Sequence, residues 1–197
     1  MRKKRITADW NEVKFKREAG KQIEKCRPGD WEHAKRVARW VKKLAANNPN
    51  LHLLIVTAYI HDIGWRDVIQ NRRVNLSKSE LLELEPRANA NSNRFATYFL
   101  EAQGFHQSQI EMVLGLIAAA DEHKSRSEME AVIVDADNLS KLTINHLREK
   151  YQPESWLEWC KLWKKEYPER IQTVVGKKLY PELLSKLEAD TLKELRK

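Results

Sequence analysis

LHLLIVTAYIHDIG, residues 51–64, contains one of the two longest apolar runs of the chain, Leu53–Ile60, and closes on a His-Asp pair before a glycine. A segment that is apolar nearly all round lies in the middle of a core, which favours a central buried helix ending near Gly64. Its Ile, Val, Thr and Tyr content also fits a buried strand, because periodicity alone does not separate the two. In either case His61 and Asp62 stand at its end, and an imidazole and a carboxylate are both good ligands for a divalent metal.

Helical periodicity dominates the sequence on either side of this stretch. Glycine and proline number only 6 each and alternating strand patterns are scarce, so we expect a nearly all-α protein. Asp30 is expected to cap a helix that carries apolar residues at spacings of three and four and stops before Pro49. Pro86 is expected to end the helical segment that contains Leu81 and Leu82. Further helices are expected within residues 1–25, over 87–103, from Ser108, from Ser127 and over 181–195.

The length of 197 residues suits a single domain. We expect its core over about residues 27–145, a basic lead-in over 1–26, and C-terminal helices over 150–197 that pack on the core. The tail carries one aromatic helix face, made by Trp156, Trp159, Cys160 and Trp163. We expect this face to pack on the domain, and the alternative is that it binds a partner protein.

The charge and the cysteines narrow the class of protein. Lys and Arg number 36 against 28 Asp and Glu, a formal net charge of +8, which favours an anionic partner such as a nucleotide, a phosphorylated metabolite or a nucleic acid. Cys26 and Cys160 are isolated, so a disulfide framework and a zinc ribbon are unsupported and a reducing compartment fits better. We see no signal peptide and no run long enough to span a bilayer, and expect a soluble cytoplasmic protein without a membrane partner.

Further candidate metal ligands lie upstream and downstream of the His-Asp pair. His33 falls in the first turn of the helix that begins near Asp30, and two aspartates lie within Val134–Leu139. Successive helix residues are about 100° apart, so Asp135 and Asp137 leave the helix on opposite sides and one ion cannot easily take both. The spacing leaves the choice between them open. Two imidazoles and two carboxylates would suit a catalytic Mn, Fe, Co, Ni, Zn or Mg ion.

In this order the residues resemble the H…HD…D signature of the HD-domain metal-dependent phosphohydrolase superfamily. The matching contexts are Trp31–Val37 around His33, Ile60–Gly64 around the central pair, and Ala136-Asp137-x-Leu139 around the last aspartate. The resemblance covers about residues 30–142. It implies an all-α, HD-domain-like helical bundle, here with a C-terminal helical extension, and it implies that residues 51–62 are helical. The ligand set that it implies is His33, His61, Asp62 and Asp137.

The chain departs from the members of that family that bind two metals. Those members carry an additional histidine in a helix that corresponds to the one expected here over residues 87–103. At that place this chain has asparagines and Arg94. They also end an Ile-x-x-His pattern with a ligand, whereas residues 117–120 read Ile-Ala-Ala-Ala, with His123 three residues later. The resemblance therefore implies one divalent metal ion. Trp65 and Arg66 stand where the alarmone hydrolases carry two acids, so that activity is not implied.

The activity expected from this site is hydrolysis of a phosphate ester in a nucleotide or another phosphorylated small molecule, by a water that the metal activates. Asp62 and Asp67 are the candidate catalytic residues, and Asp67 would help to activate the water. The candidate substrate-binding residues are Arg36, Lys141, Arg66 and His123. Solvated surface charge accounts equally well for Arg36 and Lys141, and a helix-end position accounts for His123.

A second interpretation is a basic helical module that binds nucleic acid and keeps a structural or vestigial metal site. It rests on the basic Met1–Arg5 segment and on the basic residues between Arg66 and Lys78, among them Arg72 and Arg73. No helix-turn-helix pattern or aromatic stacking platform accompanies them.

Overall fold

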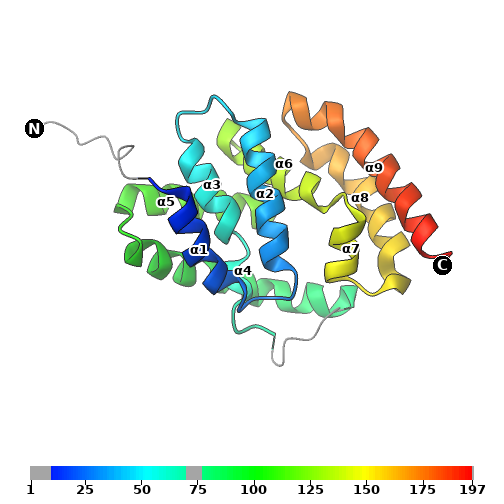
Figure 1. Ribbon diagram of the computed structural model, residues 1–197, viewed down its shortest axis with the longest axis horizontal. Helices are drawn as coiled ribbons and strands as arrows, with labels where there is room; N and C mark the ends of the chain where they lie inside the picture. The colour runs from blue at the N-terminus through cyan, green and yellow to red at the C-terminus, as the bar shows by residue number, and fades with distance from the viewer. Residues whose placement is uncertain (1–9, 70–76, 197) are drawn as a thin grey trace, which may run out of the picture.

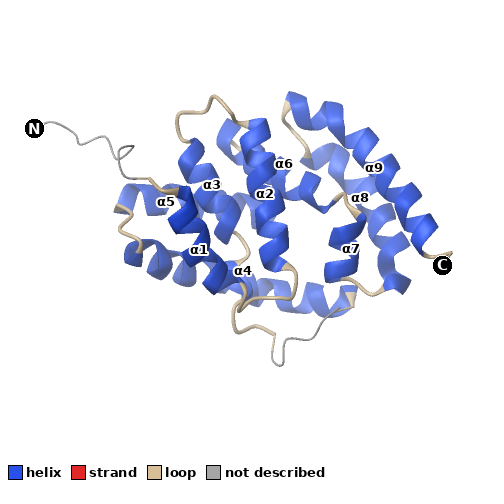
Figure 2. Cartoon of the chain, viewed as in Figure 1, coloured by secondary structure: helices blue, strands red, loops and turns tan. Residues whose placement is uncertain are grey.

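The computed structural model describes residues 10–69 and 77–196, and over these ranges it contains nine α-helices, two 3-10 turns and no strand (Figure 2). The prediction of an all-α fold is therefore confirmed. The helices are α1 (Glu12–Ile23), α2 (Asp30–Leu44), α3 (Leu51–Ile60), α4 (Lys78–Ala102), α5 (Gln107–Glu122), α6 (Glu128–Lys141), α7 (Ile144–Lys150), α8 (Trp156–Arg170) and α9 (Val174–Glu194). The 3-10 turns are η2 (Ile63–Trp65) and η4 (Pro153–Ser155).

The apolar stretch forms α3, the buried centre of the N-terminal part of the molecule. Every residue of Leu53–Ile60 is buried, and α3 contacts α1, α2, α5 and α6. A helix surrounded on all sides in this way needs no polar face, which explains why its apolar residues show no periodicity. The helix interpretation of residues 51–62 is confirmed for 51–60, and η2 follows directly after His61 and Asp62.

Two hydrophobic cores meet at α6. The larger core contains buried residues from α1 to α6, up to Ala136, and the smaller one begins at Leu139 and continues through α7, α8 and α9. Consistent with this, α6 contacts α2, α3 and α5 as well as α8 and α9. In Figure 1, α1, α3 and α5 lie on one side of α2, and α7, α8 and α9 lie on the other. The tail helices thus pack on the rest of the chain through α6.

Several expected helix boundaries are wrong. Gly29, not Asp30, is the N-cap of α2, because the Asp30 carboxylate is engaged by Arg27 and by the ammonium group of Lys150. His106 takes the N-cap of α5 in place of Ser108. Pro86 and Pro181 lie inside α4 and α9. A proline removes one backbone hydrogen bond, and the packing of a long helix can outweigh that loss.

Other predictions on the helices and tails have mixed outcomes. Ser127 caps α6 as expected, since its side chain accepts a hydrogen bond from the backbone N–H of Glu130. Within the described residues no helix is long and apolar enough to cross a membrane. The basic Met1–Arg5 segment, Arg72, Arg73 and the Lys78 side chain lie outside the described part of the chain.

Candidate metal centre

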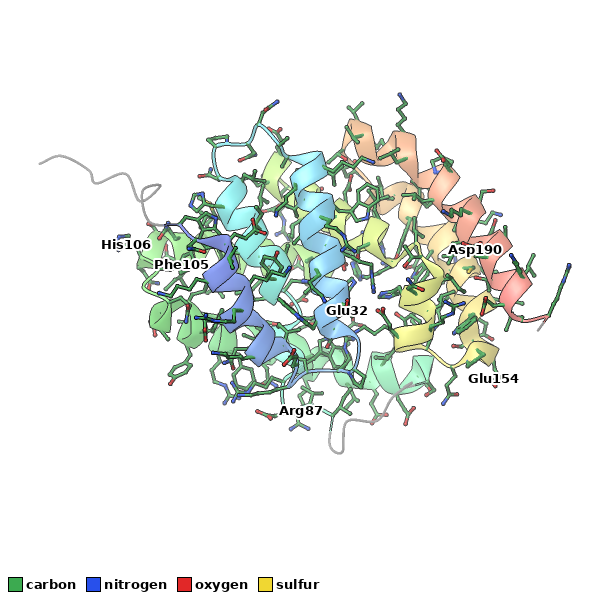
Figure 3. The ribbon with its side chains drawn as sticks, in the orientation of Figure 1. Glu32, Arg87, Phe105, His106, Glu154 and Asp190 are labelled. Carbon is green, nitrogen blue, oxygen red and sulfur yellow. The ribbon has the colours of Figure 1, made fainter. Side chains whose placement is uncertain are left out.

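Four side chains from three helices meet between α2, α3 and α6. His33 lies in the first turn of α2 and His61 is the C-cap residue of α3, with Asp62 directly after it. Asp137 comes from α6. His33, His61 and Asp137 are buried, and the side chain of Asp62 is 12% exposed. The neighbouring Glu32, in contrast, lies on the exposed face of α2 (Figure 3).

The nitrogen and oxygen atoms of these side chains face one another at short range. Nε2 of His33 lies 3.2 Å from Nε2 of His61 and 3.0 Å from Oδ1 of Asp137. Oδ1 of Asp137 lies 3.6 Å from Nε2 of His61, and Oδ2 of Asp62 lies 3.8 and 3.7 Å from the two Nε2 atoms. One ligand atom from each of His33, His61 and Asp62 lies within 4.8 Å of the others. This buried group could therefore hold a metal ion.

Hydrogen bonds on the far side of each imidazole fix which ring nitrogen carries the proton. Nδ1 of His61 lies 3.0 Å from the carbonyl oxygen of Ala58, so Nδ1–H donates. Nδ1 of His33 lies 3.1 Å from the hydroxyl of Ser140, which itself donates to the carbonyl of Asp137 and therefore accepts from His33. In their neutral forms both rings thus direct the lone pair of Nε2 toward the centre of the cluster, as metal-binding histidines do.

The donor set fits a divalent cation. The centre is lined by two Nε2 lone pairs and by oxygens of Asp62 and Asp137, and Oδ2 of Asp62 is buried without a hydrogen-bond partner among the described residues. Acceptors that face one another need a cation between them, either a proton or a metal ion. Ligand atoms about 2.1 Å from a common ion lie roughly 3.0 Å apart at right angles and roughly 3.4 Å apart in a tetrahedron. The separations of 3.0 to 3.8 Å are close to these values.

The electrostatics of the cluster favour positive charge at its centre. Burial raises the pKa of Asp62, but Arg27 and the two imidazoles outweigh it and bring that pKa to about 2. Burial lowers the pKa of His33 to about 4. Burial also lowers the pKa of His61, but Asp62 and Asp137 outweigh that effect and raise the pKa to about 9. The lowered pKa of Asp62 and the raised pKa of His61 both favour a positive charge between these groups.

The position of Asp62 depends on a close approach of the backbone and on one arginine. At Gly64, in η2, a Cβ atom would lie 2.1 Å from the carbonyl oxygen of Ala88 in α4. Only glycine lets α4 pack this closely against η2, so Gly64 serves close packing here instead of the expected helix C-cap. The guanidinium of Arg27 binds Oδ1 of Asp62 at 2.9 Å and lies over the Trp65 ring at 3.8 Å. Arg27 holds one carboxylate oxygen, which leaves Oδ2 to face the histidines.

The two aspartates of α6 face different surroundings. Asp137 lies in the cluster, and its Oδ2 accepts a hydrogen bond from Nζ of Lys141 at 2.6 Å. Asp135 accepts hydrogen bonds from the backbone N–H groups of Gln172 and Thr173, both at 2.8 Å, and from the Thr173 hydroxyl at 2.6 Å. Tertiary structure thus places Asp137 beside the histidines, whereas Asp135 faces the connection between α8 and α9.

A cavity of about 600 Å³ opens beside the cluster. His33, His61, Asp62 and Asp137 all line it, and so do two of the predicted substrate-binding residues, Lys141 and His123. His123 is the C-cap of α5, and burial together with Lys141 lowers its pKa to about 3. Both side chains therefore lie where a substrate bound at the cluster would contact them.

The other two predicted substrate-binding residues, Arg36 and Arg66, have structural partners and do not line this cavity. Arg36 forms an ion pair with Glu149 at 2.7 Å and donates to Nδ1 of His146. Arg66 donates to the side chain of Gln22 in α1 and lies over the ring of Phe95.

Asp67 has a left-handed backbone conformation, with φ of 62°, and its side chain is 73% exposed. It follows η2, and its carboxylate lies 3.4 Å from Nε of Arg66. This placement gives no support to the catalytic role expected for Asp67.

Sequence reasoning missed several residues at this site. Asp121 lines the cavity, and burial followed by the charge of Asp62 raises its pKa to about 7. His146, which belongs to no motif of the sequence, lines the cavity too, with its ring centroid 5.0 Å from that of His33. Arg27 had one local signal, its i, i+3 spacing to Asp30. The aromatic face of α8 was found, but its position along the cavity was not.

Comparison with protein-family models, curated proteins and solved structures found no match for this chain.

Proposed function

We propose that this protein is a metal-dependent phosphohydrolase of the HD type. It would hydrolyse a phosphate ester of a nucleotide or another phosphorylated small molecule. The observation that carries the proposal is the meeting of two imidazole nitrogens on the wall of a cavity, 3.2 Å apart and each 3.0 to 3.8 Å from a carboxylate oxygen of Asp62 and of Asp137. The order of these residues along the chain supports the HD assignment.

The residues that would hold the ion are His33, His61, Asp62 and Asp137. A divalent metal in such a mixed nitrogen and oxygen site supplies Lewis acidity, which polarises a phosphoryl oxygen and lowers the pKa of a coordinated water. Ser140, the Ala58 carbonyl and Arg27 hold the ligands in the required orientation. Partners of this kind orient metal ligands and tune their basicity.

Other residues of the chain would bind and neutralise the substrate phosphate. Lys141 lines the cavity one turn after Asp137, with a side chain that is 18% exposed. It can contact a phosphate oxygen next to the ion and offset the charge that develops during hydrolysis. Asp121 keeps its proton to about pH 7 in the metal-free protein, which makes it a candidate proton donor to the leaving oxygen.

The test is metal-dependent release of phosphate. Protein stripped with EDTA is reloaded separately with Mn, Fe, Co, Ni, Zn or Mg and assayed against a panel of nucleotides and phosphorylated metabolites. We expect at least one ion to support turnover and EDTA to abolish it. Absence of phosphate release with every ion and every ester would overturn the proposal.

A pair of histidine variants on α3 and its C-cap controls the assay. His61→Ala removes a ligand and is expected to lose both bound metal and turnover. His52→Ala changes a histidine on the same helix that packs beside Trp10 instead of the cluster. It is expected to retain both. Turnover that survives in His61→Ala would show that the activity arises elsewhere.

A further inference from the structure

The cavity continues from the metal centre along the C-terminal helices. Four aromatic residues line it there: Tyr151 after α7, and Trp159, Trp163 and Tyr167 on α8. We call these four residues the aromatic wall. Trp159, Trp163 and Tyr167 lie at i, i+4 and i+8, so one face of α8 presents all three rings. This part of the cavity is built from the extension that follows the candidate metal centre in the sequence.

The rings of the aromatic wall pack against one another and reach the metal centre through His146. The Tyr151 and Trp159 rings stack with centroids 4.3 Å apart, and the Trp163 and Tyr167 rings stack with centroids 5.9 Å apart. The His146 ring lies 6.0 Å from Trp163 and 5.0 Å from His33. A flat ring bound against this wall would therefore lie beside the site where the metal would bind a phosphate.

Several buried polar atoms of the cavity lining have no hydrogen-bond partner among the described residues, and two of them lie in or beside the aromatic wall. These two are Nε2 of His146 and the hydroxyl of Tyr167, in side chains that are 2% and 0% exposed. Nδ1 of His146 accepts from Arg36, so Nε2 carries the proton and can donate. Leaving such groups buried without partners is unfavourable, because each has lost its hydrogen bonds to water. A bound ligand with polar atoms on its edge would satisfy them.

The charges that line the cavity limit how many phosphates it can take. Each cationic side chain found in the described lining already has a carboxylate partner: Arg27 with Asp62, Lys141 with Asp137, Lys150 with Asp30, and Arg170 with Glu166. A triphosphate would need several cations free of such partners. One phosphate would need only the metal and a further N–H of the Lys141 ammonium group, which has three donors and uses one of them on Asp137.

We propose that the aromatic wall is a binding subsite for a heteroaromatic ring, and that the substrate is a phosphate monoester carrying such a ring, as in a nucleoside monophosphate. The ring stacks on the wall, and its polar edge bonds to His146 Nε2 and the Tyr167 hydroxyl. The position of the phosphate rests on the proposed phosphohydrolase function, whereas binding of the ring does not. Stacking on an aromatic side chain can hold any base, because every base has a π-face.

The test uses nucleosides, which carry the ring without the phosphate. Trp65, Trp159 and Trp163 line the cavity, so a ring entering it is expected to quench tryptophan fluorescence. Metal-free protein is titrated with adenosine, guanosine, cytidine and uridine, and with ribose 5-phosphate as the ligand that lacks a ring. We expect saturable quenching by at least one nucleoside and none by ribose 5-phosphate. Failure of all four nucleosides to bind would overturn the proposal.

Two variants place the bound ring on the wall. Tyr167→Phe removes only the unpartnered hydroxyl, so the protein should stay folded, and loss of one hydrogen bond weakens nucleoside binding about two- to tenfold. Tyr180→Phe is the matched control. Tyr180 lies on α9, its ring packs beside that of Tyr167, and it does not line the cavity. Trp159→Leu removes a stacking surface and should weaken binding about tenfold or more. Equal affinity in Tyr167→Phe, Trp159→Leu and Tyr180→Phe would overturn the assignment.

The outcomes separate this inference from the proposed function. If nucleosides bind the metal-free protein but no ester is hydrolysed, the ring-binding subsite is supported and the proposed phosphohydrolase function is overturned. If esters without rings are hydrolysed in the presence of metal but nucleosides do not bind, the phosphohydrolase function is supported and the proposal of a ring-binding subsite is overturned.

Discussion

Two buried aspartates on α6 meet opposite surroundings. Asp135 faces the connection between α8 and α9 and receives three hydrogen bonds, from Thr173 and Gln172. Asp137 faces two imidazole lone pairs and has Lys141 as its one strong donor. Burial raises the pKa of Asp135 despite its three donors. Burial also raises that of Asp137, but Lys141 and the histidines hold it well below the usual range.

The difference teaches how to tell a structural carboxylate from a ligand in a buried setting. A carboxylate whose oxygens are filled by donors from its own chain has nothing left for an ion, and it stabilises the fold. A carboxylate that shares its site with other acceptors is stable only with a cation among them. The two side chains are separated by about 200° around the helix axis, so one helix can serve both purposes.

Loss of metal in one aspartate variant is the largest effect that we expect. Asp137→Ala should reduce bound metal to background, because the remaining ligands hold the ion poorly. Asp135→Ala should retain it. Bound metal per chain is measured by elemental analysis on folded protein, with helical content checked by circular dichroism. Retention of metal by Asp137→Ala and its loss from Asp135→Ala would reverse the comparison.

The second effect runs in the other direction and concerns stability. Asp135→Ala deletes three hydrogen bonds to a carboxylate and leaves the N–H groups of Gln172 and Thr173 without an acceptor. The free energy of unfolding should fall by about 2 to 4 kcal/mol. Urea unfolding of the metal-free protein measures this loss. A change in the free energy of unfolding below about 0.5 kcal/mol would mean that Asp135 does not hold the connection between α8 and α9.

A smaller loss of stability is expected when the Asp135 carboxylate is displaced but not removed. At Gly176, a Cβ atom would lie 2.4 Å from Oδ2 of Asp135, so Gly176→Ala must displace the carboxylate and should cost about 1 to 3 kcal/mol. Metal content should be unchanged. Gly115→Ala is the control, because a Cβ there meets nothing within 4 Å, and it should stabilise α5 by about 0.5 to 1 kcal/mol. Equal behaviour of the two alanine variants would contradict the close approach at Gly176.

The smallest effect is pH-dependent and concerns the cavity beside Asp137. The folded protein holds the Asp121 proton to about pH 7, above the ordinary value of 3.8, chiefly because of burial. Between about pH 4 and pH 7 the unfolded chain releases that proton and the folded chain keeps it, so stability falls as pH rises. Asp121→Asn removes this penalty. In EDTA it should raise Tm more at pH 8 than at pH 5.

The exposed neighbour Glu122 provides the control for that experiment, since Glu122→Gln should give no such pH-dependent gain. A gain of the same size in Glu122→Gln, or none in Asp121→Asn, would count against a protonated Asp121. Adding a metal ion that binds the cluster should reduce the gain in Asp121→Asn, because a nearby positive charge stabilises the carboxylate.

The sequence by itself determined the helical class and the set of candidate ligands. Apolar spacing and caps such as Ser127 act over one or two turns, so they can be read locally. The ligands His33, His61, Asp62 and Asp137 were selected by residue type, order and family resemblance. Their meeting was an expectation, because no local rule brings α6 to α2 across about a hundred residues.

Only the tertiary structure decided what each polar side chain contacts. It turned Asp30 from an expected cap into a partner of Lys150, and it paired Arg36 with Glu149, a residue that lines the cavity. It also placed His146 and the aromatic face of α8 along the cavity. The physical reason is that a buried polar group must find its partner wherever packing brings one. Helix periodicity fixes which face is buried, and the packing of helices distant in sequence fixes what that face meets.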